Sequence, residues 1–316
     1  MRAGGVALLI LSVATLRAEN KPLVPTFAVG VEIVSLNLVV TDANGRQFPD
    51  LGADDIALFE DGVPQQISLF AQEEWPIRLS ILLDSSGSMS SALPVAKRAA
   101  TRLVRTLRPG DEAQVAQFSR SLDVLQESTD DHDALERAID RIAPQGETAL
   151  YNALYVTLKD LARQRSDDDL ARRAIIVFSD GEDTASMVDD EQLLDLARRA
   201  GVVVYTIGLL TPPVAGRLVE PLPTYILTAL ARETGGRAFF PRTLTELDGA
   251  YDRIARELRT LYGVGYVSHN PRPDGGWRRI AIRTRLGNLL VRHRSGYYAS
   301  SGQSRSALRI LPASSR

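Results

Sequence analysis

No cysteine occurs among the 316 residues, and there are only three histidines. The lack of cysteine excludes disulfide bonds, thiolate metal sites and cysteine nucleophiles. Neither sign of charge is in excess, because 37 Lys and Arg residues face 39 Asp and Glu residues, for a net charge of -2. Nucleic-acid-binding proteins normally carry a basic patch, whereas the arginines here are interleaved with acids, as on solvated helix faces. We therefore expect no nucleic-acid partner.

Long apolar runs are also missing, except near the N-terminus. Met1-Arg2 precedes an apolar run at residues 6–15, and Leu16-Arg17-Ala18 follows it. This arrangement is typical of a secretory signal peptide, here residues 1–18, with an uncleaved N-terminal anchor as the alternative. The run is short for a transmembrane helix, and no other stretch could span a bilayer. The mature chain is therefore expected to be secreted, periplasmic or at the cell surface, with no membrane span.

One stretch, residues 81–89, combines an apolar run with regularly spaced oxygen-bearing side chains. Residues 79–83 are typical of a buried strand of a parallel sheet, and Asp84, Ser86 and Ser88 follow at every second position. In an extended segment alternate side chains share one side, and Gly87 allows the backbone to turn tightly. Such hard oxygen ligands suit Mg²⁺, although a polar loop between a strand and a helix is the alternative interpretation.

Two later stretches favour the metal site. Thr148 lies at the start of a predicted helix, and a second buried run at residues 174–178 ends in Ser179-Asp180-Gly181. Five side chains in this order and context resemble the metal-ion-dependent adhesion site of von Willebrand factor type A domains: Asp84, Ser86, Ser88, Thr148 and Asp180. All five match the pattern in residue type. The resemblance covers roughly residues 77–261 and matches the bacterial exported type of such proteins.

The resemblance implies a chemistry for these residues. Mg²⁺ is the expected cation, with Mn²⁺ or Ca²⁺ as alternatives, and five side chains leave at least one of its six coordination positions open. A protein partner would supply an Asp or Glu carboxylate to that position. Glu147 and Asp183 lie beside the site in the sequence. They are candidates to accept hydrogen bonds from metal-bound water, with solvent-facing positions as the equal alternative.

Strands alternate with helices between residues 77 and 261, which predicts an α/β fold with a doubly wound, mostly parallel sheet of the Rossmann-like type. A hairpin at residues 113–125 would supply one antiparallel edge strand. Strand patterns also flank this domain, in an N-terminal module at residues 27–73 and in C-terminal strands at residues 262–300. We expect the two flanks to pair into a small antiparallel β-sandwich, and residues 301–316 to form a loose tail.

The sequence lacks the groups that an enzyme would need. A phosphotransferase of the haloacid dehalogenase type requires a second Asp where Ser86 stands, and no Walker loop or Gly-x-Ser-x-Gly elbow is present. None of the histidines, His132, His269 and His293, is placed beside a nucleophile. We therefore predict no enzyme, and the resemblance implies a cation-dependent, protein-binding adhesion module. The alternative is a scaffold component of an envelope-associated assembly, in which the metal is purely structural.

Overall fold

A six-stranded sheet forms the centre of the region between residues 77 and 259. The computed structural model describes residues 33–43, 45–72, 76–164, 171–209, 222–259 and 262–300. The strands of this sheet are β5 (Ile77–Asp84), β6 (Glu112–Phe118), β7 (Leu122–Thr129), β8 (Arg172–Ser179), β9 (Val203–Gly208) and β10 (Ala238–Phe239). Their order is β10-β9-β8-β5-β6-β7, and all neighbouring pairs are parallel except β6 and β7. The predicted mixed sheet with one antiparallel edge strand is therefore confirmed.

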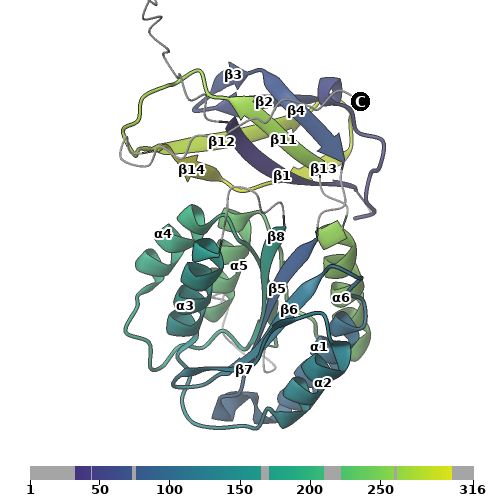
Figure 1. The fold of residues 1–316 in the computed structure, drawn as a ribbon, viewed down its shortest axis with the longest axis vertical. Coiled ribbons are helices and arrows are strands. Elements are labelled where there is room, and N and C mark those ends of the chain that lie inside the picture. The colour runs from purple at the N-terminus through teal and green to yellow at the C-terminus, as the bar shows by residue number, and fades with distance from the viewer. Residues whose placement is uncertain are drawn as a thin grey trace, which may run out of the picture. The chain divides into compact units, whose positions relative to one another are not determined.

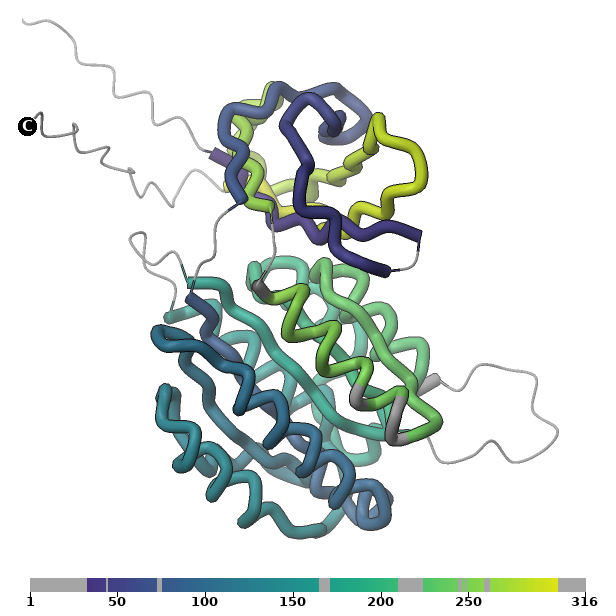
Figure 2. The backbone as a smooth tube through the Cα atoms, turned by 90° about the vertical axis from the view of Figure 1, so that its right-hand side faces the viewer, coloured from purple at the N-terminus to yellow at the C-terminus, as the bar shows by residue number. Residues whose placement is uncertain are grey.

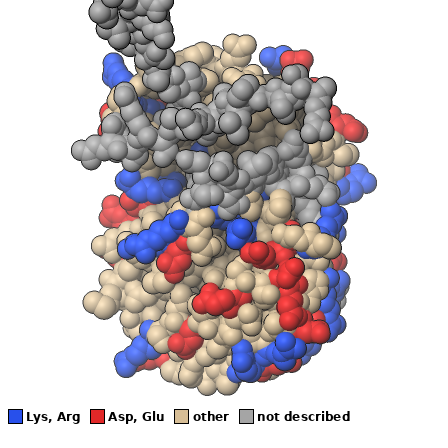
Figure 3. Space-filling model, viewed as in Figure 1, with Lys and Arg blue, Asp and Glu red and all other residues tan. Residues whose placement is uncertain are grey.

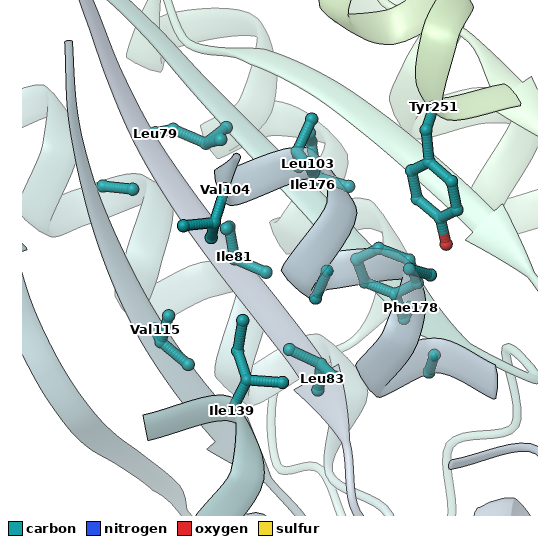
Figure 4. Packing of buried hydrophobic residues seen from close by; sticks show 14 of the residues in the cluster. Leu79, Ile81, Leu83, Leu103, Val104, Val115, Ile139, Ile176, Phe178 and Tyr251 are labelled. Atoms are coloured by element: carbon teal, nitrogen blue, oxygen red, sulfur yellow. The ribbon is translucent and has the colours of Figure 1, made fainter. Parts of the chain in front are cut away.

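Helices cover both faces of this sheet (Figures 1 and 2). They are α1 (Leu93–Val104), α2 (His132–Arg141), α3 (Leu150–Arg163), α4 (Asp190–Ala200), α5 (Leu222–Thr234) and α6 (Leu244–Arg259). Helices α1, α2 and α6 pack on one face, where Figure 4 shows Leu103, Ile139 and Tyr251 against residues of β5 and β8. Helices α3, α4 and α5 cover the other face. Because both faces are covered, β8 is buried along its whole length.

The strand register brings the ends of β5, β6 and β8 to one level. Leu83 of β5 lies opposite Phe178 of β8, and Asp84 lies opposite Phe118 of β6. The carboxyl ends of parallel strands share one edge of a sheet, and sites of open α/β sheets lie outside that edge. The loops that follow β5 and β8 therefore emerge side by side.

The chain before β5 and the chain after α6 form one β-sandwich. Its strands are β1 (Ile33–Asp42), β2 (Ile56–Glu60), β3 (Val63–Gln65), β4 (Ile67–Gln72), β11 (Tyr262–Val267), β12 (Trp277–Thr284), β13 (Leu289–Arg292) and β14 (Gly296–Tyr298). They form two antiparallel sheets, β13-β1-β11-β4 and β14-β12-β2-β3, and apolar side chains of both sheets share one core. This arrangement confirms the predicted pairing of the two flanks around an inserted α/β domain.

Some details differ from the predictions. The apolar runs at residues 56–59 and 67–70 predict two strands joined by a turn at Glu60-Asp61-Gly62. The turn instead joins β2 to β3, and β4 pairs with β11 in the other sheet. The predicted helix at Thr148 begins at Leu150, because the preceding backbone bonds to neighbouring loops. The predicted signal peptide at residues 1–18 and the predicted tail at residues 301–316 lie outside the described residues. In the described part of the chain, no helix is long and apolar enough to cross a membrane.

Candidate metal centre

The loop after β5 is joined to the loop before α3 by backbone hydrogen bonds. The 3-10 helix η2 (Gly87–Ser91) opens the first loop. The Gly87 N–H donates to the Gly146 carbonyl at 3.1 Å, and the Gln145 N–H donates to the Ser85 carbonyl at 2.6 Å. Gly146 adopts a φ of 66°, which a residue with a side chain rarely does. These bonds fix the spacing of the two loops.

A third loop, which follows β8, joins the same network. The N–H groups of Thr184 and Ala185 donate to the Thr148 carbonyl at 2.8 and 2.9 Å. The Thr148 N–H in turn donates to the hydroxyl of Thr184 at 3.1 Å. Thr148 therefore lies at the centre of the junction, and its side chain is buried with 3% exposure. Its own hydroxyl makes no hydrogen bond within the described residues, which leaves an unused oxygen at this point.

Asp84 ends β5 as a fully buried carboxylate, with 0% exposure. It accepts hydrogen bonds from the Ser179 hydroxyl at 2.6 Å and from the Ser86 N–H at 2.9 Å. Burial, with a smaller contribution from the negative charge of Asp180, raises the pKa of Asp84 to about 6, because the hydrogen bonds do not offset the loss of water. The carboxylate is therefore held in place without a neutralising charge.

Ser179 is a contributor that the sequence reasoning did not assign. Its hydroxyl donates to Asp84 and accepts a hydrogen bond from the Gly181 N–H at 2.9 Å, so it connects the ends of β5 and β8. The only signal in the sequence is its place at the end of a buried run, directly before Asp180.

The other predicted ligands gather at the same edge of the sheet. The hydroxyl oxygens of Ser86 and Ser88 lie 3.0 Å apart, and Ser88 is exposed to solvent. Asp180, with 9% exposure, accepts a hydrogen bond from the Glu182 N–H at 3.0 Å through one carboxylate oxygen. It is close enough to Asp84 for the two charges to repel. The two carboxylates and the three hydroxyl-bearing residues thus lie on three loops that are joined to one another or leave the sheet at the same edge.

Comparison with known proteins agrees with this geometry. Residues 79–182 match the family model described as von Willebrand factor type A domain. The chain contains a von Willebrand factor type A domain. Such domains are typically protein-interaction modules.

Individual relatives are distant. The chain is 24% identical over 229 residues to a UPF0353 protein of Mycolicibacterium paratuberculosis, covering 66% of this chain and 67% of the relative. It is similar to an aerotolerance-related membrane protein from Bacteroides fragilis, with 21% identity, 58% and 98% of the two chains covered, and a TM-score of 0.46. It is also similar to proximal thread matrix protein 1 from the mussel byssus, solved with zinc in its adhesion-site motif, with 15% identity, 63% and 49% covered, and a TM-score of 0.47.

The two further acids named from the sequence have other partners in the type A domain. The Glu147 carboxylate pairs with the Arg120 guanidinium at 2.8 Å, and both side chains are more than half exposed. Asp183 accepts hydrogen bonds from the Tyr151 N–H at 3.1 Å and the Ser186 hydroxyl at 2.7 Å. Among the described residues, neither carboxylate contacts one of the five predicted ligands through a hydrogen bond. Glu147 therefore faces solvent, and Asp183 supports the first turn of α3.

The donor set of the type A domain fits a hard divalent cation. Nowhere in the described ranges do three or more His, Cys, Asp and Glu side chains gather as a metal site, so the charge here comes from Asp84 and Asp180 alone. Neither carboxylate is paired with Lys or Arg in the part of the chain that the structure describes. Two negative charges and neutral hydroxyls match Mg²⁺ or a similar cation, which prefers oxygen ligands and retains water.

Proposed function

We propose that the type A domain binds a divalent cation through Asp84, Ser86, Ser88, Thr148 and Asp180, and uses it to bind a carboxylate of a protein partner. One observation carries the proposal. Asp84 is completely buried beside a second carboxylate, without a neutralising Lys or Arg in the described residues. Buried charges in proteins are normally paired or coordinate metals, so this pair of acids calls for a cation.

The five residues have unequal roles in this proposal. Asp84 and Asp180 supply the charge that holds the cation, and Ser86, Ser88 and Thr148 supply hydroxyl oxygens. Ser179 acts by holding Asp84 in place. Mg²⁺ fits the donor set best, with Mn²⁺ and Ca²⁺ as alternatives that share the preference for oxygen.

The partner is a protein that presents an Asp or Glu side chain. When bound, the cation supplies a coordination position that a partner carboxylate can occupy. Ser88 is exposed, whereas Asp84 and Ser86 are buried with 0% and 1% exposure, so a partner carboxylate would approach from the side of Ser88. The buried side chains thus hold the site, and the exposed rim receives the partner.

The test is calorimetric titration of Mg²⁺ and Mn²⁺ into the chelator-treated full-length chain. We expect saturable binding by the parent protein and loss of binding by Asp180→Ala with the fold retained, as followed by circular dichroism. Glu147→Gln is the matched control, since it removes a nearby negative charge that is paired with Arg120 outside the site. Binding that survives Asp180→Ala, or a parent that binds no cation, would contradict the assignment.

Adhesion and a purely structural metal are separated by a second measurement. Proteins retained by the immobilised chain are compared in Mg²⁺ and in chelator, for the parent and for Asp180→Ala. Retention that requires both the cation and Asp180 supports adhesion, whereas cation binding without metal-dependent retention supports a scaffold role. We further propose that the chain acts outside the cytoplasm, which fractionation and sequencing of the mature N-terminus would test.

A further inference from the structure

A groove runs between α1 and α2 on the surface of the type A domain. It has a volume of about 780 Å³ and is lined by Ser90, Leu93, Pro94, Lys97, Arg98, Thr101, Arg102, Arg105, Glu136, Asp140, Ile142 and Pro144. Leu93 and Ile142, with 2% and 3% exposure, form an apolar floor. The volume is within the usual range for binding clefts, so the groove can accommodate a few side chains. We call it the α1–α2 groove.

One end of the groove adjoins the candidate metal centre. Ser90, which lines the groove, donates its hydroxyl hydrogen to the Gly87 carbonyl at 2.6 Å, within the loop that carries Ser86 and Ser88. On the other side, Pro144 directly precedes Gln145, whose N–H donates to the Ser85 carbonyl. The same two loops therefore form the rim of the metal centre and the end of the groove.

Cationic side chains predominate along the groove. Four of the lining residues are Lys or Arg, and two, Glu136 and Asp140, are acids. Figure 3 shows Lys and Arg side chains gathered at the lower right, where Figure 1 places α1 and α2, with acidic side chains beside them.

The cations differ in how far they are neutralised. Arg105 pairs with Glu136 through two bonds of 2.7 and 2.8 Å, and Arg102 pairs with Asp252 of α6 at 3.1 Å. Lys97 donates to the carbonyls of Asp140 and Ile142 at 2.7 and 3.0 Å, and it forms no ion pair with a carboxylate of the described residues. Arg98 is exposed and makes no ion pair or hydrogen bond with any described residue.

We propose that the α1–α2 groove binds an acidic polypeptide segment of the same partner whose carboxylate is held at the metal centre. This inference rests on the proposed function. Charge complementarity carries it: Arg98 offers an unpaired cation and Lys97 a second charge that only carbonyls contact, in a groove that begins at the metal-site loops. A segment with one acid at the metal and further acids along the groove can bind both the metal and the cations Lys97 and Arg98. The aliphatic parts of its side chains can pack on the apolar floor.

The test measures the affinity of a fluorescein-labelled hexa-glutamate peptide for the full-length chain in Mg²⁺ and in chelator, with a hexa-glutamine peptide as the neutral reference. The variant is Arg98→Glu. Its matched control is Arg163→Glu, the same charge reversal at an exposed residue of α3, on the opposite face of the sheet. We expect Arg98→Glu to weaken binding about tenfold, which corresponds to about 1.4 kcal/mol, because the reversal replaces an attraction to the peptide by a repulsion. We expect Arg163→Glu to have little effect.

The outcomes separate the groove from the metal centre. Calorimetric Mg²⁺ binding that is unchanged in Arg98→Glu, together with weakened peptide binding, supports the groove. Three outcomes would overturn the groove proposal without affecting the metal site. They are an equal loss of peptide affinity in both variants, no loss in either variant, and a parent that binds Mg²⁺ but not the acidic peptide. If the parent binds no Mg²⁺, the proposed function fails, and the groove is then judged by the same pair of variants in chelator.

Discussion

Glu60 and Asp84 are carboxylates buried to a similar degree, with 2% and 0% exposure, in two different regions of the molecule. Glu60 ends strand β2 in the sandwich, and Asp84 ends strand β5 in the type A domain. Their surroundings differ in the number of donors and in the presence of a positive charge. The two side chains therefore show what separates a structural carboxylate from a candidate ligand.

Glu60 is surrounded by donors. It accepts hydrogen bonds from the hydroxyls of Tyr266 at 2.7 Å, Tyr297 at 2.9 Å and Ser268 at 2.6 Å. The guanidinium of Arg278, itself buried, lies 4.0 Å away. The protein thus meets both the hydrogen-bonding and the charge requirements of this carboxylate from its own residues.

Asp84 is held by the Ser179 hydroxyl and by Ser86, and it has a neighbouring negative charge instead of a positive one. Burial alone is therefore a weak indicator of a metal site, because Glu60 shares it. The informative difference is that the protein provides a counter-charge for Glu60 and provides none for Asp84 in the residues that the structure describes. Four experiments can break or sharpen this contrast.

The largest effect is expected from Glu60→Ala. It removes the shared acceptor of three hydroxyls and the nearby negative charge of the buried Arg278, so we expect the free energy of unfolding to fall by about 3 to 5 kcal/mol. Urea unfolding of the full-length chain measures the change. Glu60→Gln keeps an acceptor of similar size and should cost less. Equal losses for the two variants would show that shape, and not hydrogen bonding, governs this position.

Asp84→Asn should behave in the opposite way. In chelator we expect this variant to be at least as stable as the parent, because an amide removes a buried charge and its repulsion with Asp180. In Mg²⁺ at a hundred times its dissociation constant, the parent should gain about 2.7 kcal/mol and the variant nothing. Urea unfolding of both proteins in chelator and in Mg²⁺ tests the expected stability without the cation and the expected gain with it. A gain in the variant would show that Asp84 is not needed for the cation.

The pH dependence of the metal-free chain follows from the raised pKa of Asp84. The folded chain holds this proton up to about pH 6, whereas the ordinary value is 3.8. The contribution of Asp84 to the free energy of unfolding is therefore highest below pH 3.8 and is lost as the pH rises through about 6. The measurement is the urea midpoint in chelator of the parent and of Asp84→Asn between pH 5 and pH 8. The midpoint of the parent minus that of the variant should fall as the pH rises across this window. A flat difference would contradict the buried, unneutralised state of Asp84.

Sequence patterns are sufficient to predict those residues of the site that are close together in the sequence. Asp84, Ser86 and Ser88 follow a buried strand at alternate positions, and this spacing by itself indicates one oxygen-rich loop. Thr148 and Asp180 lie far along the chain. The place of Asp180 beside Asp84 depends on the adjacency of β5 and β8, and the place of Thr148 depends on the hydrogen bonds between the loops after β5 and before α3. The family resemblance implies both arrangements, and the spacing alone does not.

The remaining features depend on contacts across long stretches of sequence. The sequence pattern assigns Glu60 to a turn, yet the hydroxyls that surround it come from residues more than 200 positions later. Ser179 reaches Asp84 only because strand register sets the two strand ends level. No local pattern encodes such register, so the hydrogen-bond partners of buried acids could not be predicted even where the fold class was.

The smallest effects are expected when a single hydroxyl donor is removed from each carboxylate. Tyr297→Phe leaves Glu60 with two hydroxyl donors and Arg278, so we expect a loss of about 1 kcal/mol in the free energy of unfolding and no change in cation affinity. Ser179→Ala takes from Asp84 the hydroxyl donor at the end of the neighbouring strand, and it also removes the acceptor of the Gly181 N–H.

A similar loss of about 1 kcal/mol is expected for Ser179→Ala. Because the Ser179 hydrogen bond lowers the pKa of Asp84, its removal should also move the pH window of the metal-free chain upward. Cation affinity should fall as well, since a misplaced carboxylate binds less well. Urea unfolding and calorimetric titration on both variants measure these quantities. If Tyr297→Phe weakens cation binding as much as Ser179→Ala does, the two carboxylates are not independent, and the contrast between the regions fails.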